Sequence, residues 1–176
     1  GAKMFVNRLK KNEKEWKNFD KLPEILGFTA SPDDCYLVLR GMRTLDVRMR
    51  AHEKNAMEVA DFLQSRKEIK KIYFPALKSH EGHEIFKRDH KGSNGMLTIE
   101  FNENISKEEA IKFVDNLELF SIGASWGGYE SLATVTVPPR TVTDYSKSGV
   151  FVRFHIGLED TQDLIADLKQ AFDKMK

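Results

Sequence analysis

The 176-residue chain lacks most of the features that mark specialised classes of protein. Its single cysteine can form neither an internal disulfide nor a cysteine-rich zinc site, and it suits a reducing cytosol. With 28 basic and 27 acidic residues the net charge is only +1, which is not the concentrated positive field that nucleic-acid binding needs. No apolar run approaches the roughly 20 residues that cross a bilayer. We therefore expect a cytoplasmic protein that binds neither nucleic acid nor membrane.

The start of the chain carries mixed charge. It begins at Gly1 and not at a methionine, and a charged run follows where a secretory signal would have an apolar region. We expect no secretory signal, and we expect the true start to lie upstream. Residues 1–24 alternate basic and acidic side chains around the apolar anchors Trp16 and Phe19, which predicts a solvated helix or linker.

A strong helix start follows at residues 31–34. Ser31 supplies an N-cap hydroxyl, Pro32 suits the first helical position, and two aspartates complement the helix dipole. Apolar residues then recur at helical spacing to about Ser65. Unless Gly41 interrupts it, this helix covers residues 32–65 and is about 50 Å long. A helix of that length exceeds a small domain, so we expect it to join two bodies.

Beyond residue 65 the chain alternates strands and helices. Alternating apolar patterns predict strands over residues 69–74, 96–101, 119–122 and 150–156. Helices are predicted over residues 80–89, from Ser106 with a capping box, and from about Asp160. The order predicts an α/β or α+β domain, an open sheet with helices on one face.

Three other features have ordinary structural interpretations. The set His80, Glu81, His83 and His90 could be imagined as zinc ligands, but its spacing is not that of a metalloprotease, and we expect a polar helix surface and no metal. Residues 92–95 lack the Gly-Lys-Ser/Thr ending of a phosphate loop and precede a strand, which favours a turn. Cys35 stands among apolar helix positions, so we expect it to be buried and unreactive.

Two segments point to binding. Residues 125–131 place two adjacent glycines between Ser125, Trp126 and Tyr129, a pattern that fits either a ligand-binding bend or a tight turn. In strand 150–156, alternation puts Arg153 on the same face as Phe151 and His155. An arginine in an apolar strand needs an anion, either a ligand carboxylate that matches its planar fork or an internal acid. The residues alone leave both alternatives open.

Four motifs in order resemble the pyridoxal-phosphate (PLP) enzymes of cysteine and methionine metabolism. The resemblance runs from about Trp16 to the end of the chain. The Trp-Gly-Gly-Tyr sequence of the third motif is typical of the branch that breaks a carbon–sulfur bond by β-elimination, whereas other branches more often carry Leu-Gly-Gly. The motifs occupy residues 40–45, 75–89, 120–131 and 153–160.

This resemblance implies an architecture of fold type I. A large doubly wound domain holds the cofactor, and a long helix joins it to a small domain, a mainly antiparallel sheet with helices on one face. Residues 1–31 would be the tail of the large domain and a linker, residues 32–65 the connecting helix, and residues 66–176 the small carboxy-terminal domain.

The resemblance also implies a chemistry and a set of residues. Arg153 would hold the α-carboxylate of an amino-acid substrate, and Ser125 and Trp126 would line the same pocket. The lysine that binds PLP, and the other cofactor ligands of the family, have no counterpart in this sequence. We therefore expect a carboxy-terminal fragment of a carbon–sulfur lyase, which needs the missing amino-terminal part to bind PLP and forms a homotetramer when complete. Another lyase or synthase of the family, or a non-catalytic interaction module, is the alternative.

Overall fold

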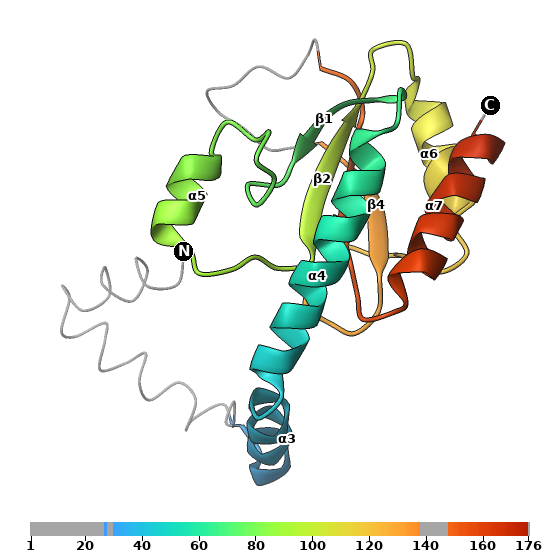
Figure 1. Ribbon diagram of the computed structural model, residues 1–176. Helices are drawn as coiled ribbons and strands as arrows, with labels where there is room; N and C mark the ends of the chain where they lie inside the picture. The colour runs from blue at the N-terminus through green and yellow to red at the C-terminus, as the bar shows by residue number, and fades with distance from the viewer. Residues whose placement is uncertain (1–26, 28–29, 138–147, 176) are drawn as a thin grey trace, which may run out of the picture. The chain divides into compact units, whose positions relative to one another are not determined.

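The computed structural model describes residues 27, 30–137 and 148–175 of the chain. The chain divides into two compact units, residues 1–44 and residues 45–176. In the first unit the described part is chiefly helix α3 (Pro32–Met42), and the second unit holds the sheet and its helices (Figure 1). The charged segment at residues 1–24 lies outside the described residues.

Helix α3 begins as the sequence predicts. Ser31 Oγ accepts a hydrogen bond from Asp34 N at 3.0 Å, the Asp34 carboxylate accepts from Ser31, and Pro32 occupies the first turn. No residue of α3 is buried, so Cys35 is exposed, and its predicted burial is wrong.

The continuous helix predicted over residues 32–65 is interrupted. Helix α4 (Leu45–Gln64) begins after a turn at residues 43–44. Both the backbone N–H and the hydroxyl of Thr44 bond the carbonyl of Gly41, each at 3.3 Å. These contacts close a turn three residues long in place of the next helical hydrogen bond, which is how Ser and Thr side chains compete with a helix.

The second unit is built on a five-stranded sheet in the order β1-β2-β5-β4-β3. Pairings β1–β2, β2–β5 and β5–β4 are antiparallel and β3–β4 is parallel, so the described sheet is mixed and mainly antiparallel. The sequence predicts β2 with the same bounds and the other three nearly so, but it misses β4. The strands are β1 (Ile69–Tyr73), β2 (Met96–Phe101), β3 (Ser121–Ile122), β4 (Leu132–Thr136) and β5 (Phe151–His155).

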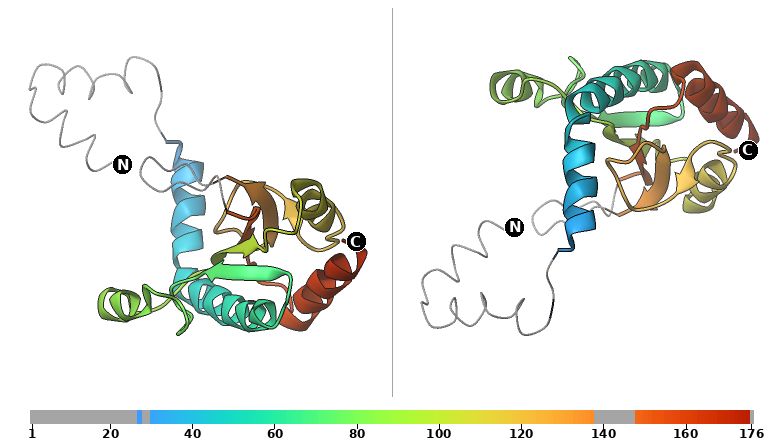
Figure 2. Two further views of the ribbon diagram at one scale, coloured as in Figure 1. Left: turned by 90° about the horizontal axis from the view of Figure 1, so that it is seen from above. Right: turned by 90° about the horizontal axis from the view of Figure 1, so that it is seen from below.

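Helices α4, α6 (Lys107–Asp115) and α7 (Thr161–Lys174) cover one face of this sheet (Figure 2). The predicted capping box is present, since Ser106 caps α6 together with Glu109, and α7 begins near the predicted Asp160, which accepts from Gln162 N. Between the helices and the sheet lies the core, where the Phe113 ring is 4.5 Å from Phe172. The prediction of helices on one face is confirmed, and the other face of the sheet is available for a site.

Helix α5 (His83–Asp89) stands apart from this helix layer and has no buried residue (Figure 1). It begins three residues later than the sequence predicts, because residues 75–82 form a series of tight turns. In the described part of the chain, no helix is both long and apolar enough to cross a membrane.

Candidate functional site

Strand β5 presents its side chains alternately to the two faces of the sheet. Val152 and Phe154 belong to the core under the helices. Phe151, Arg153 and His155 alternate with them and therefore face the other side, as the sequence alternation predicts.

The guanidinium of Arg153 lies beside the glycine-rich segment. Its Nη2 donates to the carbonyl of Ala124 at 2.6 Å, and its neighbours across the sheet are Thr98 and Thr134. Among the described residues, Arg153 forms no ion pair with an acidic side chain. Because a guanidinium has five N–H donors and the side chain is only half-buried, N–H groups remain that can meet an anion.

The glycine-rich segment is the connection between the parallel strands β3 and β4. It bends at Gly127, whose φ of +85° is in the region that favours glycine. Ser125 is exposed and the side chain of Trp126 is 67% exposed. The structure thus brings the three residues predicted to bind substrate to one place, because Arg153 holds the residue that precedes Ser125 and Trp126.

The same bend contacts a buried histidine of β5. Nε2 of His155 lies 3.0 Å from the carbonyl oxygen of Gly128 and 3.2 Å from the backbone nitrogen of Gly127. Arg153 and His155 therefore hold the two ends of the segment that carries Ser125 and Trp126.

A hydrogen-bonded network joins the end of this segment to the turn that follows β5. The buried Ser131 donates from N and Oγ to the two carboxylate oxygens of Glu159, at 2.7 and 2.8 Å, and its Oγ accepts from Gly157 N at 2.8 Å. A Cβ on Gly157 would lie 2.3 Å from the carbonyl oxygen of Tyr129. The third and fourth sequence motifs are therefore in direct contact, and glycine is required where their backbones meet.

Helix α4 holds the same turn from the other side. Nδ1 of His52 is 2.8 Å from the carbonyl oxygen of Ile156. Asn55 donates to the carbonyls of Gly157 and Glu159, at 3.1 and 3.0 Å, and accepts from the Thr161 hydroxyl at 3.1 Å. The helix thus fixes the chain just after the strand that carries Arg153.

A pocket of about 360 Å³ opens between α4, the start of β2 and the glycine-rich segment. Its wall is largely apolar, and the polar groups on it come from α4, β5 and the residues before β2. No lysine lines it. The lining residues are Leu45, Arg48, Met49, His52, Asn94, Gly95, Met96, Trp126, Gly127 and His155.

Glu100 is a buried carboxylate on the same face of the sheet as Arg153. Burial acts to raise its pKa, but hydrogen bonds from Tyr73 Oη at 2.7 Å, from Lys70 and from Gly149 N outweigh burial and lower the pKa below the ordinary value of about 4.5. Glu100 is therefore ionised at neutral pH, and its carboxylate is hydrogen bonded by its own partners. It is not the internal acid that would neutralise Arg153.

The histidines considered as zinc ligands do not converge. His80 accepts from a neighbouring backbone N–H, His83 bonds the carbonyl of Pro75 at 3.0 Å, and the ring of His90 stacks on Phe86. Within the described ranges, no three His, Cys, Asp or Glu side chains gather as a metal site requires.

Residues 92–94 have no regular structure and Gly95 is a bend, so the turn predicted over residues 92–95 is not formed. Ser93 N donates to the Glu53 carboxylate at 2.9 Å. Gly95 O accepts from Ile156 N at 2.7 Å, and a Cβ on Gly95 would lie 3.1 Å from the His155 ring. These long-range contacts, which join the segment to α4 and to the turn after β5, hold it in an irregular conformation.

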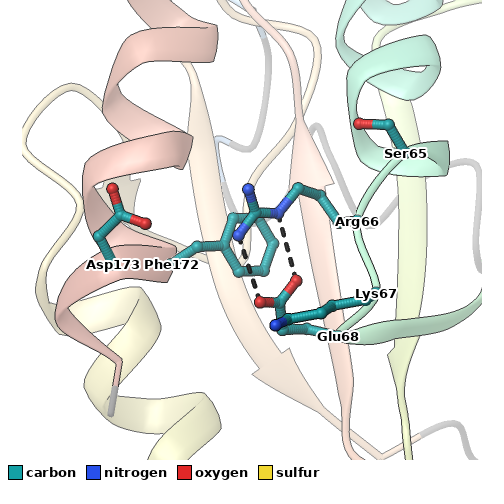
Figure 3. A pocket seen from close by; sticks show the side chains of 6 residues that line it. All are labelled: Ser65, Arg66, Lys67, Glu68, Phe172 and Asp173. Carbon is teal, nitrogen blue, oxygen red and sulfur yellow. Dashed lines mark hydrogen bonds and ion pairs between the residues drawn. The ribbon is translucent and has the colours of Figure 1, made fainter.

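A second hollow, of about 410 Å³, lies where the end of α4 meets α7. Figure 3 shows the guanidinium of Arg66 between the carboxylate of Glu68 and the ring of Phe172. The two Arg66–Glu68 hydrogen bonds are each 3.2 Å, and the guanidinium carbon is 4.6 Å from the ring centre. The guanidinium of Arg66 is already bound by a carboxylate and packed on an aromatic ring. We therefore interpret this hollow as a structural contact between the end of α4 and α7.

Sequence reasoning missed several residues that build the site. His52, Asn55, Ser131 and Glu159 act through partners that are distant in the sequence, and no local pattern reveals such pairs. The sequence did contain a signal for β4. Thr134 and Thr136 alternate with apolar residues over residues 133–137, and a proline follows at position 138.

Comparison with known proteins gives consistent matches over nearly the whole chain. A family model described as Cys/Met metabolism PLP-dependent enzyme matches residues 6–173. Cystathionine β-lyase of Bordetella avium is 45% identical over 161 residues, which are 90% of this chain and 40% of that protein. Cystathionine γ-lyase of Dictyostelium discoideum is 36% identical over 170 residues, 93% of this chain and 43% of that protein.

A solved structure agrees with these matches. The crystal structure of cystathionine γ-synthase from Xanthomonas oryzae pv. oryzae, in complex with aminoacrylate and cysteine, has a TM-score of 0.73 and 32% sequence identity. The match covers 93% of this chain and 44% of that chain. The present chain thus spans about two fifths of the length of these three proteins, between 40% and 44%.

Proposed function

The chain belongs to the family of PLP-dependent enzymes of cysteine and methionine metabolism, and from this premise we propose that it is the substrate-clamping part of a cystathionine β-lyase. The complete enzyme would cleave cystathionine by α,β-elimination to homocysteine, pyruvate and ammonia. The missing amino-terminal part would contribute the PLP-binding residues. A homotetramer is the assembly we expect of the complete enzyme.

The placement of Arg153 is the observation that carries this proposal. Its guanidinium is fixed at one N–H by Ala124 O and lies next to Ser125, and no internal acid among the described residues neutralises it. The remaining N–H groups suit a carboxylate, which a guanidinium binds with two parallel hydrogen bonds. Clamping the α-carboxylate fixes the orientation of the amino acid, and such positioning contributes several kcal/mol to lowering a barrier.

The described residues do not make a complete PLP site. Among the described residues, no lysine lines the pocket beside Trp126, and the amine that holds the cofactor would come from the missing amino-terminal part. When bound in the complete enzyme, PLP supplies an electron sink for elimination. The role proposed for this chain is confined to binding and orienting the substrate through Arg153, Ser125 and Trp126.

Two observations favour a β-lyase within the family. The B. avium relative with that name is 45% identical, and residues 126–129 have the Trp-Gly-Gly-Tyr form. A γ-lyase relative and a γ-synthase structure also match, so another family activity is the second candidate. The two differ in product, because β-elimination of cystathionine gives pyruvate and γ-elimination gives 2-oxobutyrate.

The proposal is tested in the complete enzyme with Arg153→Lys. We expect kcat/KM for cystathionine to fall about 10- to 100-fold, mainly through KM, because a point charge replaces a planar fork and charge-assisted hydrogen bonds are worth about 1.5–3 kcal/mol. Pyruvate should remain the product.

Arg66→Lys is the matched control. It breaks a bidentate pair of the same kind in a structural contact, so it should lower the melting temperature and leave KM unchanged. The proposed binding of the substrate carboxylate by Arg153 would be refuted if Arg153→Lys unfolded the protein and left the kinetics of the folded fraction unchanged. Release of 2-oxobutyrate by the unmodified enzyme would refute the β-lyase assignment.

A further inference from the structure

Two buried imidazoles meet beneath the glycine-rich segment. His52 of α4 is 2% exposed and His155 of β5 is 3% exposed, and their ring centres are 5.1 Å apart. A carbonyl oxygen can only accept, so Nδ1 of His52 carries a proton and donates to Ile156 O at 2.8 Å. His52 is thus tied to the backbone that immediately follows His155.

The ring of His155 brackets the bend at Gly127 and Gly128. Its Nε2 is 3.0 Å from Gly128 O and therefore donates to it. The backbone N–H of Gly127 points at the same ring, with its nitrogen 3.2 Å from Nε2 and 3.5 Å from Nδ1, and Nδ1 is the nitrogen left to accept. One side chain therefore contacts a donor and an acceptor on opposite sides of the bend.

The position of this ring is itself fixed. On one side stands His52, and on another Gly95, where a Cβ would come within 3.1 Å of the ring. Gly95 O also accepts from Ile156 N at 2.7 Å, which keeps that backbone close. The ring has little room to turn away from Gly127 and Gly128.

The bend has few other restraints of its own. Two adjacent glycines have the greatest conformational freedom of any residue pair, and neither Gly127 nor Gly128 has an atom near the position of a Cβ. Arg153 holds the segment at Ala124 O and His155 holds it at Gly127 and Gly128. Ser125 and Trp126 lie between these two anchors.

We propose that His155, oriented by His52, is a positioning residue that holds the Gly127–Gly128 bend so that Ser125 and Trp126 face the carboxylate bound by Arg153. This inference rests on the proposed function for its effect on catalysis. The ordering of the bend is independent of that function and can be measured without it.

The test compares two substitutions of His155 in the complete enzyme. His155→Leu fills similar space but cannot hydrogen bond, whereas His155→Gln offers one donor and one acceptor on a flexible chain. Amide hydrogen exchange is measured by mass spectrometry on peptides covering residues 123–131, and kcat and KM are measured with cystathionine. His90→Leu, on an exposed helix end, is the control.

For His155→Leu we expect about tenfold faster exchange in residues 123–131, because the hydrogen bond to Gly128 O, together with the longer contact from Gly127 N–H, is worth about that factor. We also expect a KM increase of about tenfold with a smaller change in kcat. His155→Gln should recover most of both, and His90→Leu should change neither.

The proposal is overturned if His155→Leu leaves exchange in residues 123–131 unchanged, or if exchange rises equally across the whole chain. Should His155→Leu fail to fold, His52→Leu, which leaves β5 intact, must show the same localised increase. An enzyme that does not cleave cystathionine refutes the proposed function, while the exchange measurement still decides the role of His155.

Discussion

Tyr73 and Glu100 illustrate how single side chains on the open face of the sheet are held by their partners. Glu100 is 3% exposed, and its carboxylate accepts from the phenol of Tyr73 at 2.7 Å. Its lowered pKa means that the folded state stabilises the ionised form. This stabilisation is fully present above about pH 4.5 and is lost as the pH falls through the folded-state pKa.

Tyr73→Phe should therefore lower the free energy of unfolding at pH 7 by about 1–3 kcal/mol, since a buried carboxylate loses a donor. The difference from the unmodified protein should shrink as the pH falls below about 4.5 and through the folded-state pKa of Glu100, where the carboxylate takes up a proton. Urea denaturation at pH 7 and at a series of lower pH values measures both effects. Tyr36→Phe is the control, because Tyr36 is exposed, and a loss that stays equal at every pH would mean that Tyr73 acts by packing alone.

Gly157 is a position where a single added methyl group should be destabilising. Besides Tyr129 O at 2.3 Å, its Cβ would lie 2.7 Å from the backbone of Glu130, and neither backbone can move without disturbing Ser131. We expect Gly157→Ala to lower stability by about 1–3 kcal/mol, a typical cost of overpacking. Gly41→Ala, in α3 with open space around it, should instead raise stability by about 0.5–1 kcal/mol. Thermal melting of both variants checks this, and a neutral Gly157→Ala would contradict the close approach.

At the scale of helices and strands, the sequence predicted the features that depend on residues close together in the chain. The caps at Ser31, Ser106 and Asp160 are present because capping needs only residues three apart or fewer. The placement of Arg153 on the face opposite the helices follows from the alternation along β5, which the sequence displays. The sequence left open whether the helix is interrupted at Gly41, because the bonds from Thr44 to Gly41 O that close the turn compete with helical ones and no local pattern decides between them.

The candidate site was predicted only in part for a related reason. Arg153, Ser125 and Trp126 came from motifs, whereas their supports join residues that are 27 to 106 positions apart. Asn55 on α4 is one example, since both its carbonyl partners and its hydroxyl donor lie beyond β5. Such pairings depend on how the elements pack, and no spacing within one element encodes them.

Asn55 gives a prediction at this scale. In Asn55→Asp, two backbone carbonyls lose their donor and face a carboxylate, so we expect a loss of about 2–4 kcal/mol in stability, within the range for breaking a buried polar network. Asn94→Asp is a matched control, because Asn94 acts only as an acceptor from Met96 N, and aspartate preserves that bond. Chemical denaturation of the two variants makes the comparison. Equal stability would show that α4 and the turn after β5 are held together by apolar packing.

For the whole molecule, the chain spans about two fifths of the B. avium relative, and no lysine of the described ranges lines the pocket beside Trp126. We expect the 176-residue chain alone to show no stoichiometric Schiff-base absorbance when PLP is added, whereas the complete enzyme should show it. A spectrophotometric titration with PLP decides the matter. Stoichiometric absorbance that disappears on borohydride reduction and maps to a lysine of this chain would refute the assignment.

The contacts between α4 and the turn after β5 also determine when, during synthesis of the chain, this part of the structure can form. His52 bonds a carbonyl 104 residues further on, and Asn55 is bonded by a hydroxyl 106 residues further on. At about 5–20 residues per second, a ribosome needs about 5–20 seconds to add that stretch. For that interval α4 has been synthesised but these polar partners have not, so α4 can be fixed against the turn after β5 only when the residues up to Thr161 have emerged. A chain that stopped between β5 and this turn would therefore contain all five strands of the described sheet but lack the polar groups that hold α4 beside Arg153.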